Sequence, residues 1–242
     1  MPGSWEIKAE RDRRVLLVII QPPDMTFTMN FAQTRRNLQL PPGSQIRAIT
    51  GLPFGPARNQ AAKQAVEEGF GALAFLDADV VVQPDAYMKL LGSGFDLVSG
   101  LYYQRFPPLL PCFFNLAVNE KKEAVRVEIA GWQPGDIVPA TFVPAGLLLI
   151  RRRVLELAFL HFGGTPFFWG LDTAPLPDPA GGIAPTFSED FNFSFKCLDR
   201  LRIQPMVMTS VVGLHESWGT VGPRWMLPMP DSNPLYGVAG TS

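Results

Sequence analysis

Two acidic residues stand in one short apolar stretch of the sequence, "FLDADVVVQP" at residues 75–84. Asp77 and Asp79 are separated by a single residue, in a pattern that is typical of a buried strand and the turn after it. An ionised carboxylate taken out of water costs free energy unless a partner compensates its charge. Two carboxylates at this spacing can hold Mg²⁺ or Mn²⁺ together with the diphosphate that such a cation carries. The alternative is that Asp79 caps the turn before Pro84 by hydrogen bonding within the loop.

The first half of the chain alternates strands and helices, and this pattern predicts an α/β sheet that is mostly parallel. Because Asp77 ends an apolar strand, we expect it at the carboxyl edge of the sheet, where open α/β sheets bind ligands. The expected strands are residues 13–20, 44–50, 72–77 and 96–103, and the expected helices are residues 25–39, 56–69 and 83–94.

The second half adds segments that predict antiparallel strands and a few helices. Its Gly- and Pro-rich segment, residues 163–187, is typical of a lid or binding loop. Ser188 precedes two acids and is expected to cap a helix. The expected strands are 111–118, 124–130, 137–144 and 202–208; residues 145–160 form one apolar segment, residues 188–201 a helix, and residues from 219 an irregular tail.

The composition restricts the class of protein. The 242 residues are 47% hydrophobic with a net charge of −1, which is enough apolar material for one sizeable core, and we expect a single domain. Two cysteines without metal-ligand spacing favour a reducing compartment, the cytoplasm, and no segment predicts a membrane span or a signal peptide. A pI near 6.1 argues against a globally basic protein that coats nucleic acid. The basic run at residues 151–153 is either a local basic face or a solvated helix start.

Residues 55–91, "GPARNQAAKQAVEEGFGALAFLDADVVVQPDAYMKLL", resemble the nucleotide-sugar half of the A-type glycosyltransferase fold, especially the family-2-like group found in bacteria and phages. Residues 96–108, 142–156 and 188–218 match later blocks of that group in the same order. The resemblance implies a GT-A-like (Rossmann-like) fold with a mostly parallel central sheet flanked by helices and an added antiparallel acceptor-side portion. The implied divisions of the single 1–242 domain are a nucleotide-sugar half at about 14–103, an acceptor and catalytic half at about 104–218 and a tail at 219–242.

The resemblance also implies roles for individual residues. Asp79 is similar to the metal-binding second acid, Asp77 to the acid that contacts the ribose or supports the metal through water, and His215 to a late histidine that completes the metal shell. Without the resemblance, a lone histidine such as His215 is more often structural. The residues expected to bind the nucleotide sugar are Gln21, Pro22, Asp24, Arg58, Asn59, Asp77, Ala78, Tyr103, Arg105, Pro144, Ala145, Gly146 and Trp218.

Glu189 and Asp190 match an acidic pair at a helix start that faces the acceptor in this family. A helix N-terminus stabilises an ionised carboxylate, which is then ready to take a proton from a hydroxyl group. We expect Asp190 to be the base, whereas Glu189 is either catalytic or part of a capping box with Ser188. Gly146 either lets a substrate approach the backbone or marks a plain bulge.

The expected function is a metal-dependent glycosyltransferase that moves a sugar from a nucleoside-diphosphate sugar, such as a UDP-sugar, to an acceptor hydroxyl. The configuration is inverted if Asp190 is the base, and a retaining enzyme would need no base there. Acceptors left open are glycans, lipid-linked sugars, protein side chains and hydroxymethylated DNA bases, and the oligomeric state is also open. The alternatives are a non-catalytic sugar- or nucleotide-binding module and a haloacid-dehalogenase-like phosphatase, whose signature "FLDADVV" also fits.

Overall fold

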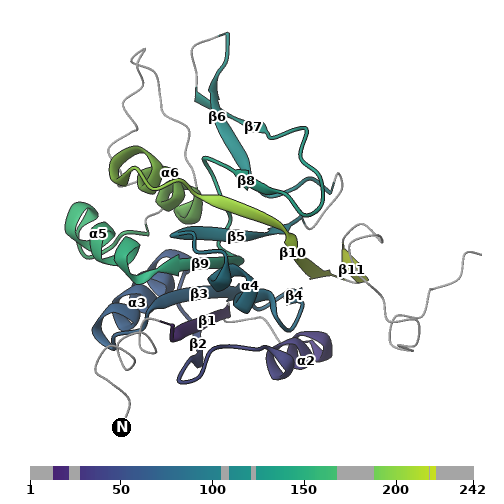
Figure 1. Cartoon of the computed structure of the whole chain (residues 1–242), viewed down its shortest axis with the longest axis vertical. Coiled ribbons are helices and arrows are strands. Elements are labelled where there is room, and N and C mark those ends of the chain that lie inside the picture. Colours follow the sequence, from purple (N-terminus) through teal and green to yellow (C-terminus); the bar gives the residue numbers. More distant parts are fainter. Residues whose placement is uncertain are drawn as a thin grey trace, which may run out of the picture.

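A computed structural model describes residues 13–21, 28–104, 109–120, 124–167, 188–217 and 219–221. Its main feature is a large twisted sheet with the strand order β2-β1-β3-β9-β5-β10-β11 (Figure 1). These strands are β1 (Val15–Gln21), β2 (Gln45–Thr50), β3 (Ala72–Asp77), β5 (Leu97–Tyr102), β9 (Leu147–Arg151), β10 (Met206–Ser217) and β11 (Gly219–Val221).

Most strands of this sheet run in one direction. β1 pairs in parallel with β2 and β3, and β5 pairs in parallel with β10. β9 lies between β3 and β5 and is antiparallel to both, so β3 and β5 also point the same way. The mostly parallel sheet flanked by helices that the sequence predicts is therefore confirmed.

Helices cover both faces of the sheet, and alternate residues of β1 are therefore buried on opposite sides. Leu16, Val18 and Ile20 belong to one core cluster, and Val15, Leu17 and Ile19 to the other. The first cluster includes residues of α3 (Phe54–Glu67), α5 (Arg152–Phe162) and α6 (Glu189–Leu201); the second includes residues of α2 (Met29–Asn37) and α4 (Ala86–Gly92). A strand buried on both faces needs a continuous apolar sequence, which is what β1 has.

The buried side of α3 is built from small residues. Ala57, Ala61, Ala62 and Ala65 are all at most 1% exposed and recur at the three- and four-residue spacing of one helix face. Short side chains let the helix approach the sheet closely. The long side chain of Arg58, near the start of α3, can therefore reach the end of β3.

The added antiparallel portion is also present. β6 (Phe114–Val118) and β7 (Ala124–Glu128) form a separate hairpin, while β4 (Val80–Val82) and β8 (Ile137–Pro139) both pair antiparallel with β10. The hairpin projects beyond α6 in Figure 1.

Four expectations from the sequence differ from the structure. The apolar segment at residues 145–160 divides into β9 and α5, because the pattern of apolar residues alone does not separate a buried strand from a buried helix. β4 was not expected, since its three residues read as the end of a turn. β10 continues to Ser217, and β11 folds back onto it within the segment expected to be an irregular tail, because long-range pairing extends strands beyond their local signal.

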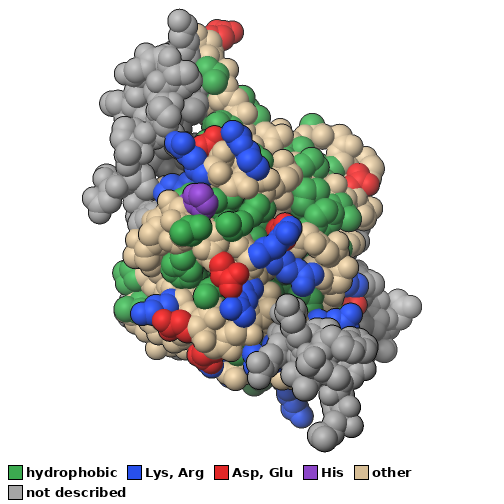
Figure 2. Space-filling view, turned by 60° about the vertical axis from the view of Figure 1, so that its left-hand side comes forward, with side chains coloured by type: hydrophobic (Ala, Val, Ile, Leu, Met, Phe, Trp, Pro, Cys, Tyr) green, Lys and Arg blue, Asp and Glu red, His purple; other side chains and the backbone are tan. Residues whose placement is uncertain are grey.

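In the part of the chain that the structure describes, no helix is long and apolar enough to cross a membrane. The face shown in Figure 2 carries acidic and basic side chains side by side. Lys63 with Glu67 and Arg152 with Glu156 are ion pairs between residues one helical turn apart, and they also place opposite charges next to each other.

Candidate functional site

A buried arginine connects the end of β3 to the start of α6. The side chain of Arg58 is 3% exposed; its Nη2 lies 3.5 Å from Oδ1 of Asp77, and its Nη1 forms an ion pair with Glu189. The Glu189 side chain is 4% exposed, whereas that of Asp77 is 21% exposed. The guanidinium also lies over the rings of Phe54 and Phe75, at 5.3 and 5.7 Å from their centroids. A guanidinium buried to this extent needs carboxylates to compensate its desolvation, and Asp77 and Glu189 supply them.

Gly146 lies directly against the Asp77 carboxylate. The Asp77 N–H donates a hydrogen bond of 3.0 Å to the Gly146 carbonyl. A Cβ atom on Gly146 would lie 2.7 Å from Oδ2 of Asp77 and 2.7 Å from the hydroxyl oxygen of Tyr102. No side chain fits there, so the glycine is required by the close approach of these two oxygens.

Asp79 and His215 are brought to the same corner of the sheet by the pairing of β4 with β10. His215 stands opposite Val80 in this ladder, and the next N–H, that of Glu216, donates to the Asp79 carbonyl at 2.7 Å. The His215 ring contacts the Tyr102 ring edge-on at 5.0 Å between centroids. Two residues that are 136 positions apart in sequence thus become neighbours through a three-residue strand that was not expected.

Asp190 lies at the N-terminus of α6, and hydrogen-bond donors hold its carboxylate in place. Oδ1 accepts from the Ser188 hydroxyl and from the Phe191 N–H at 2.8 Å, and Oδ2 accepts from the Ala145 N–H at 3.1 Å. A carboxylate has about four lone-pair sites. The three bonds leave one lone-pair site on Oδ2 for a further hydrogen-bond donor. Ser188 is the N-cap residue, as expected, but its hydroxyl serves Asp190 instead of capping the helix.

The backbone of residues 145 and 146 joins the two acids. The Ala145 N–H binds Asp190, and the Gly146 carbonyl accepts from Asp77. Glu189, the neighbour of Asp190, pairs with Arg58 on the buried side of the helix. The first turn of α6 therefore separates its two acids, one directed to the buried arginine and one to the turn before β9.

Burial and neighbouring charges shift the pKa values of two groups in this region. Burial raises the pKa of Tyr102 well above its ordinary value, and the charge of Asp77 raises it further. Burial also raises the pKa of Cys112 to about 12; the charge of Asp190 adds to this rise, and Arg126 opposes it. Both groups are therefore neutral at neutral pH.

Cys112 and Arg126 also belong to this region, although no sequence pattern predicts it. Arg126 lies on β7, with its guanidinium 5.4 Å from the ring centroids of both Phe114 and Phe191. No motif surrounds either residue. The pairing of β7 with β6 brings Arg126 to Phe191 of α6, and the Cys112 N–H donates to the Tyr102 carbonyl at 2.9 Å, so only long-range contacts place them here.

The other predicted site residues have varied surroundings. The side-chain amide of Asn59 donates from Nδ2 to the Phe167 carbonyl at 2.7 Å, and its Oδ1 accepts from the Phe167 N–H at 2.8 Å, so Asn59 holds the chain beyond α5. Gln21 ends β1 at the same edge as Asp77. Ala78, Tyr103 and Ala145 are buried. Pro22, Asp24, Arg105, Trp218 and most of the predicted loop at 163–187 lie outside the described residues.

The described residues do not form a metal cage by themselves: no group of three or more His, Cys, Asp or Glu side chains among them is arranged to hold a metal ion. A cation that a protein shares with a diphosphate needs fewer protein ligands, because phosphate oxygens and water complete its shell. The carboxylates of Asp77 and Asp79 and the imidazole of His215 are suitable donors for Mn²⁺ or Mg²⁺ of this kind. Their chemistry fits a shared cation and does not fit a structural metal centre.

No protein-family model matches the sequence, and no curated protein matches it. Among solved structures, the chain is similar to A197 from STIV, with a TM-score of 0.52 and 16% identity over 84% of this chain and 86% of A197. It also aligns with GalNAc-T7 in complex with UDP, GalNAc and Mn²⁺ (TM-score 0.48, 12% identity, 84% of this chain and 43% of that one). A further alignment is to S. aureus TarS 1-349 in complex with UDP-GlcNAc (TM-score 0.44, 9% identity, 82% of this chain and 58% of that one). The similarity to A197 is one of fold, and membership in the family-2-like group stays a prediction.

The ion pair at the centre of this site predicts a large loss of stability when the arginine is removed. Arg58→Met should lower the free energy of unfolding by about 3–5 kcal/mol, because it leaves Glu189 buried without a cation. Arg58→Met combined with Glu189→Leu should recover part of that loss, since the double variant removes the uncompensated charge as well. Urea denaturation monitored by circular dichroism gives the free energies.

The control is Lys63→Met on the same helix. Lys63 is 68% exposed and pairs with Glu67 in solvent, so this change should alter stability by no more than about 0.5 kcal/mol. An Arg58→Met variant as stable as the Lys63→Met variant would contradict the structural role assigned to Arg58.

Proposed function

We propose that this protein is a metal-dependent glycosyltransferase that transfers a sugar from a nucleoside-diphosphate sugar to an acceptor hydroxyl. The observation that supports it most is the position of Asp190. Its carboxylate is held by three donors at a helix N-terminus, with one acceptor site left on Oδ2. One residue further along the turn before β9, the Gly146 carbonyl binds Asp77 at the carboxyl edge of the sheet. Asp190, the proposed base for the acceptor, and Asp77 on the donor side are therefore both bonded to one short stretch of backbone, Ala145 and Gly146.

On the donor side, Asp79 and His215 would hold Mn²⁺ or Mg²⁺, and Asp77 would support the ion from beside them. When bound, the cation would neutralise the charge of the leaving nucleoside diphosphate. Arg58 holds the Asp77 carboxylate from the interior side. Gly146, which has no side chain, leaves room for Oδ2 of Asp77 and the hydroxyl of Tyr102. We assign Asp77 to the ribose or to a water on the metal, as the resemblance in sequence implies, with a UDP-sugar as the donor.

On the acceptor side, Asp190 would accept the proton of the attacking hydroxyl through the remaining lone pair of Oδ2. Attack on the anomeric carbon from this side, opposite the leaving diphosphate, inverts its configuration. Glu189 does not share this role, because its carboxylate pairs with Arg58 in the protein interior; it is a positioning residue that fixes the first turn of α6. The acceptor would lie between α6 and the β6–β7 hairpin and be a glycan, a protein side chain or a modified DNA base.

The first test is turnover. Incubation with Mn²⁺, a panel of nucleotide sugars and candidate acceptors should release free nucleoside diphosphate, and Asp79→Ala should abolish this release while the protein stays folded. Asp85→Ala is the matched control: Asp85 begins the nearby helix α4, pairs with Lys89 in solvent and should be dispensable. Donor binding without any turnover would favour the alternative of a non-catalytic binding module. Full activity of Asp79→Ala would contradict the metal assignment.

Asp190→Asn tests the base. The amide keeps the size of the side chain but cannot take up the proton, so the transfer rate should fall by about 10² to 10⁴, with donor affinity unchanged. Asp199→Asn makes the same chemical change on the same helix, where Asp199 pairs with Arg200 at the surface, and should keep full activity. Rates come from single-turnover kinetics and donor affinity from calorimetry. A fully active Asp190→Asn variant, or a product with the donor's anomeric configuration, would exclude Asp190 as an inverting base.

A further inference from the structure

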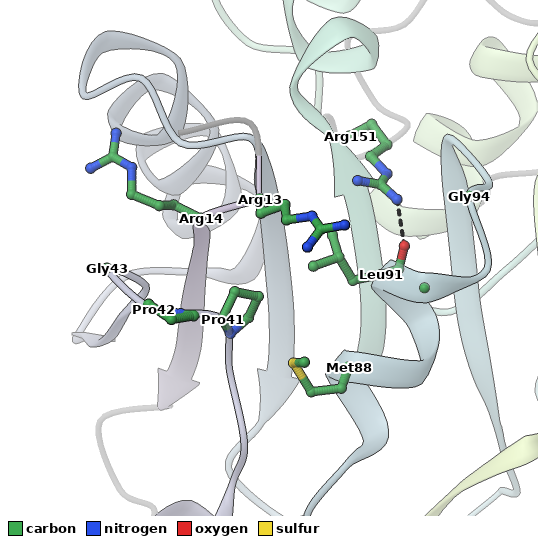
Figure 3. A pocket seen from close by; sticks show the side chains of 10 residues that line it. Arg13, Arg14, Pro41, Pro42, Gly43, Met88, Leu91, Gly94 and Arg151 are labelled. Carbon is green, nitrogen blue, oxygen red and sulfur yellow. Dashed lines mark hydrogen bonds between the residues drawn. The ribbon is translucent and has the colours of Figure 1, made fainter. Parts of the chain in front are cut away.

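A cavity of about 880 Å³ lies at the amino end of the sheet, the edge opposite to Asp77. Arg13 and Arg14 directly precede β1, and Arg151 ends the antiparallel strand β9 opposite Ala72, the first residue of β3. The six residues of β3 separate this edge from the candidate active site by about 17 Å, at roughly 3.3 Å per residue. The cavity is lined by Arg13, Arg14, Pro41, Pro42, Gly43, Met88, Leu91, Gly92, Gly94 and Arg151 (Figure 3).

The charge of the cavity lining has one sign. The lining residues include three arginines and no acid. In Figure 3 the side chains of Arg13 and Arg151 extend toward each other across the cavity, whereas Arg14 turns away. Arg14 is occupied elsewhere: it donates to the Gly69 carbonyl at 2.8 Å and lies over the ring of Phe70. Two cationic groups therefore face one space.

The neighbouring arginines of the basic run at 151–153 behave differently. Arg152 pairs with Glu156, and Arg153 pairs with Asp96 through two hydrogen bonds. Arg151 donates to the Leu91 carbonyl instead. Within the part of the chain that the structure describes, the side chain of Arg13 makes no hydrogen bond or ion pair. The two arginines that face the cavity are thus the ones whose charge no carboxylate contacts directly.

Burial makes the charge of Arg151 costly. Burial lowers the pKa of its guanidinium from the ordinary value; the charge of Asp96 raises that pKa, and the charge of Arg153 lowers it again. An anion in the cavity would offset both the desolvation and the repulsion between guanidinium groups. Guanidinium groups bind phosphate and carboxylate oxygens with paired N–H donors.

The rest of the lining is apolar. Pro41, Pro42, Met88 and Leu91 contribute hydrocarbon surface, and Met88 is 41% exposed although it lines a concave site. Methionine side chains adapt to ligands of different shape. The volume lies within the range of small-molecule sites, which are apolar cavities with a few polar groups that fix orientation.

We propose that this cavity is a second ligand site, separate from the proposed catalytic edge, that binds an organic anion: a phosphate or carboxylate group held by Arg13 and Arg151, with an apolar chain against Met88, Leu91 and the two prolines. The site does not depend on the proposed function, because none of its lining residues takes part in the candidate active site. The proposal also gives a role to Arg151 of the basic run, which has no part in the proposed sugar transfer.

The test is binding of hexyl phosphate, measured by calorimetry at low ionic strength on the full chain. Hexyl phosphate should bind more tightly than inorganic phosphate, which lacks the chain, and than hexanol, which lacks the charge. Hexanoate should also bind, since a carboxylate offers the same oxygens. Arg13→Gln should weaken binding of hexyl phosphate about tenfold or more, the effect of losing a charge-assisted hydrogen bond.

Arg13→Gln is the clean variant, because Arg13 is exposed and its loss should not disturb the fold. Arg151→Gln should weaken binding as well, with its folding checked by circular dichroism. Arg152→Gln, at the position next to Arg151, is the matched control: Arg152 pairs with Glu156 and is not part of the cavity lining, so this variant should bind as the unchanged protein does. Absence of hexyl phosphate binding, or equal affinities of the Arg13→Gln and Arg152→Gln variants, would overturn the proposal.

Discussion

The structure depends on one buried cation. Arg58 extends from α3 to the end of β3 and to the start of α6, where it contacts Asp77 and Glu189 while only 3% of its side chain is exposed. A guanidinium in this position is stable only if both carboxylates remain beside it. The alanines of α3 let the helix pack closely enough for that reach, and Phe54 and Phe75 exclude water from around the charge. The requirement to compensate one charge therefore fixes the relative positions of three elements that are far apart in sequence.

The same requirement explains why the first turn of α6 carries two acids. Glu189 pairs with Arg58 in the interior, and the adjacent Asp190 is directed to the turn before β9, where its Oδ2 accepts a hydrogen bond from the Ala145 N–H. Gly146 follows and has no room for a side chain between Asp77 and Tyr102. The acids at the carboxyl edge of the sheet thus have different surroundings: Asp77 and Glu189 compensate a buried charge, whereas the Asp190 carboxylate accepts hydrogen bonds from Ser188, Phe191 and Ala145. The amino edge has the opposite character, with arginines around an apolar cavity and no acid in its lining.

The sequence predicted the parts of the fold that local patterns determine. The apolar run of β1, the alternation of strands and helices up to Tyr102, and the position of Asp77 at the end of β3 all follow from periodicity and turn residues. It could not predict β4 or the full length of β10, because these strands are defined by pairing with each other, and this pairing is what places His215 beside Asp79. It left Glu189 either catalytic or part of a capping box with Ser188, because the order of residues in the sequence does not show that the Glu189 side chain turns inward to Arg58. The cavity arginines gave no signal beyond a basic run, because Arg13 and Arg151 meet only through the register of β1, β3 and β9.

The most direct measurement of the central claim is anomalous diffraction from crystals grown with Mn²⁺ and UDP. We expect a manganese peak at the carboxyl edge of the sheet, roughly 2.0–2.5 Å from a carboxylate oxygen of Asp79, with the diphosphate on the same ion. Asp190 should face the open side of that site with its Ala145 contact intact. Manganese and nucleotide bound elsewhere, for example with the diphosphate between Arg13 and Arg151, would contradict the assignment of this edge as the site of sugar transfer.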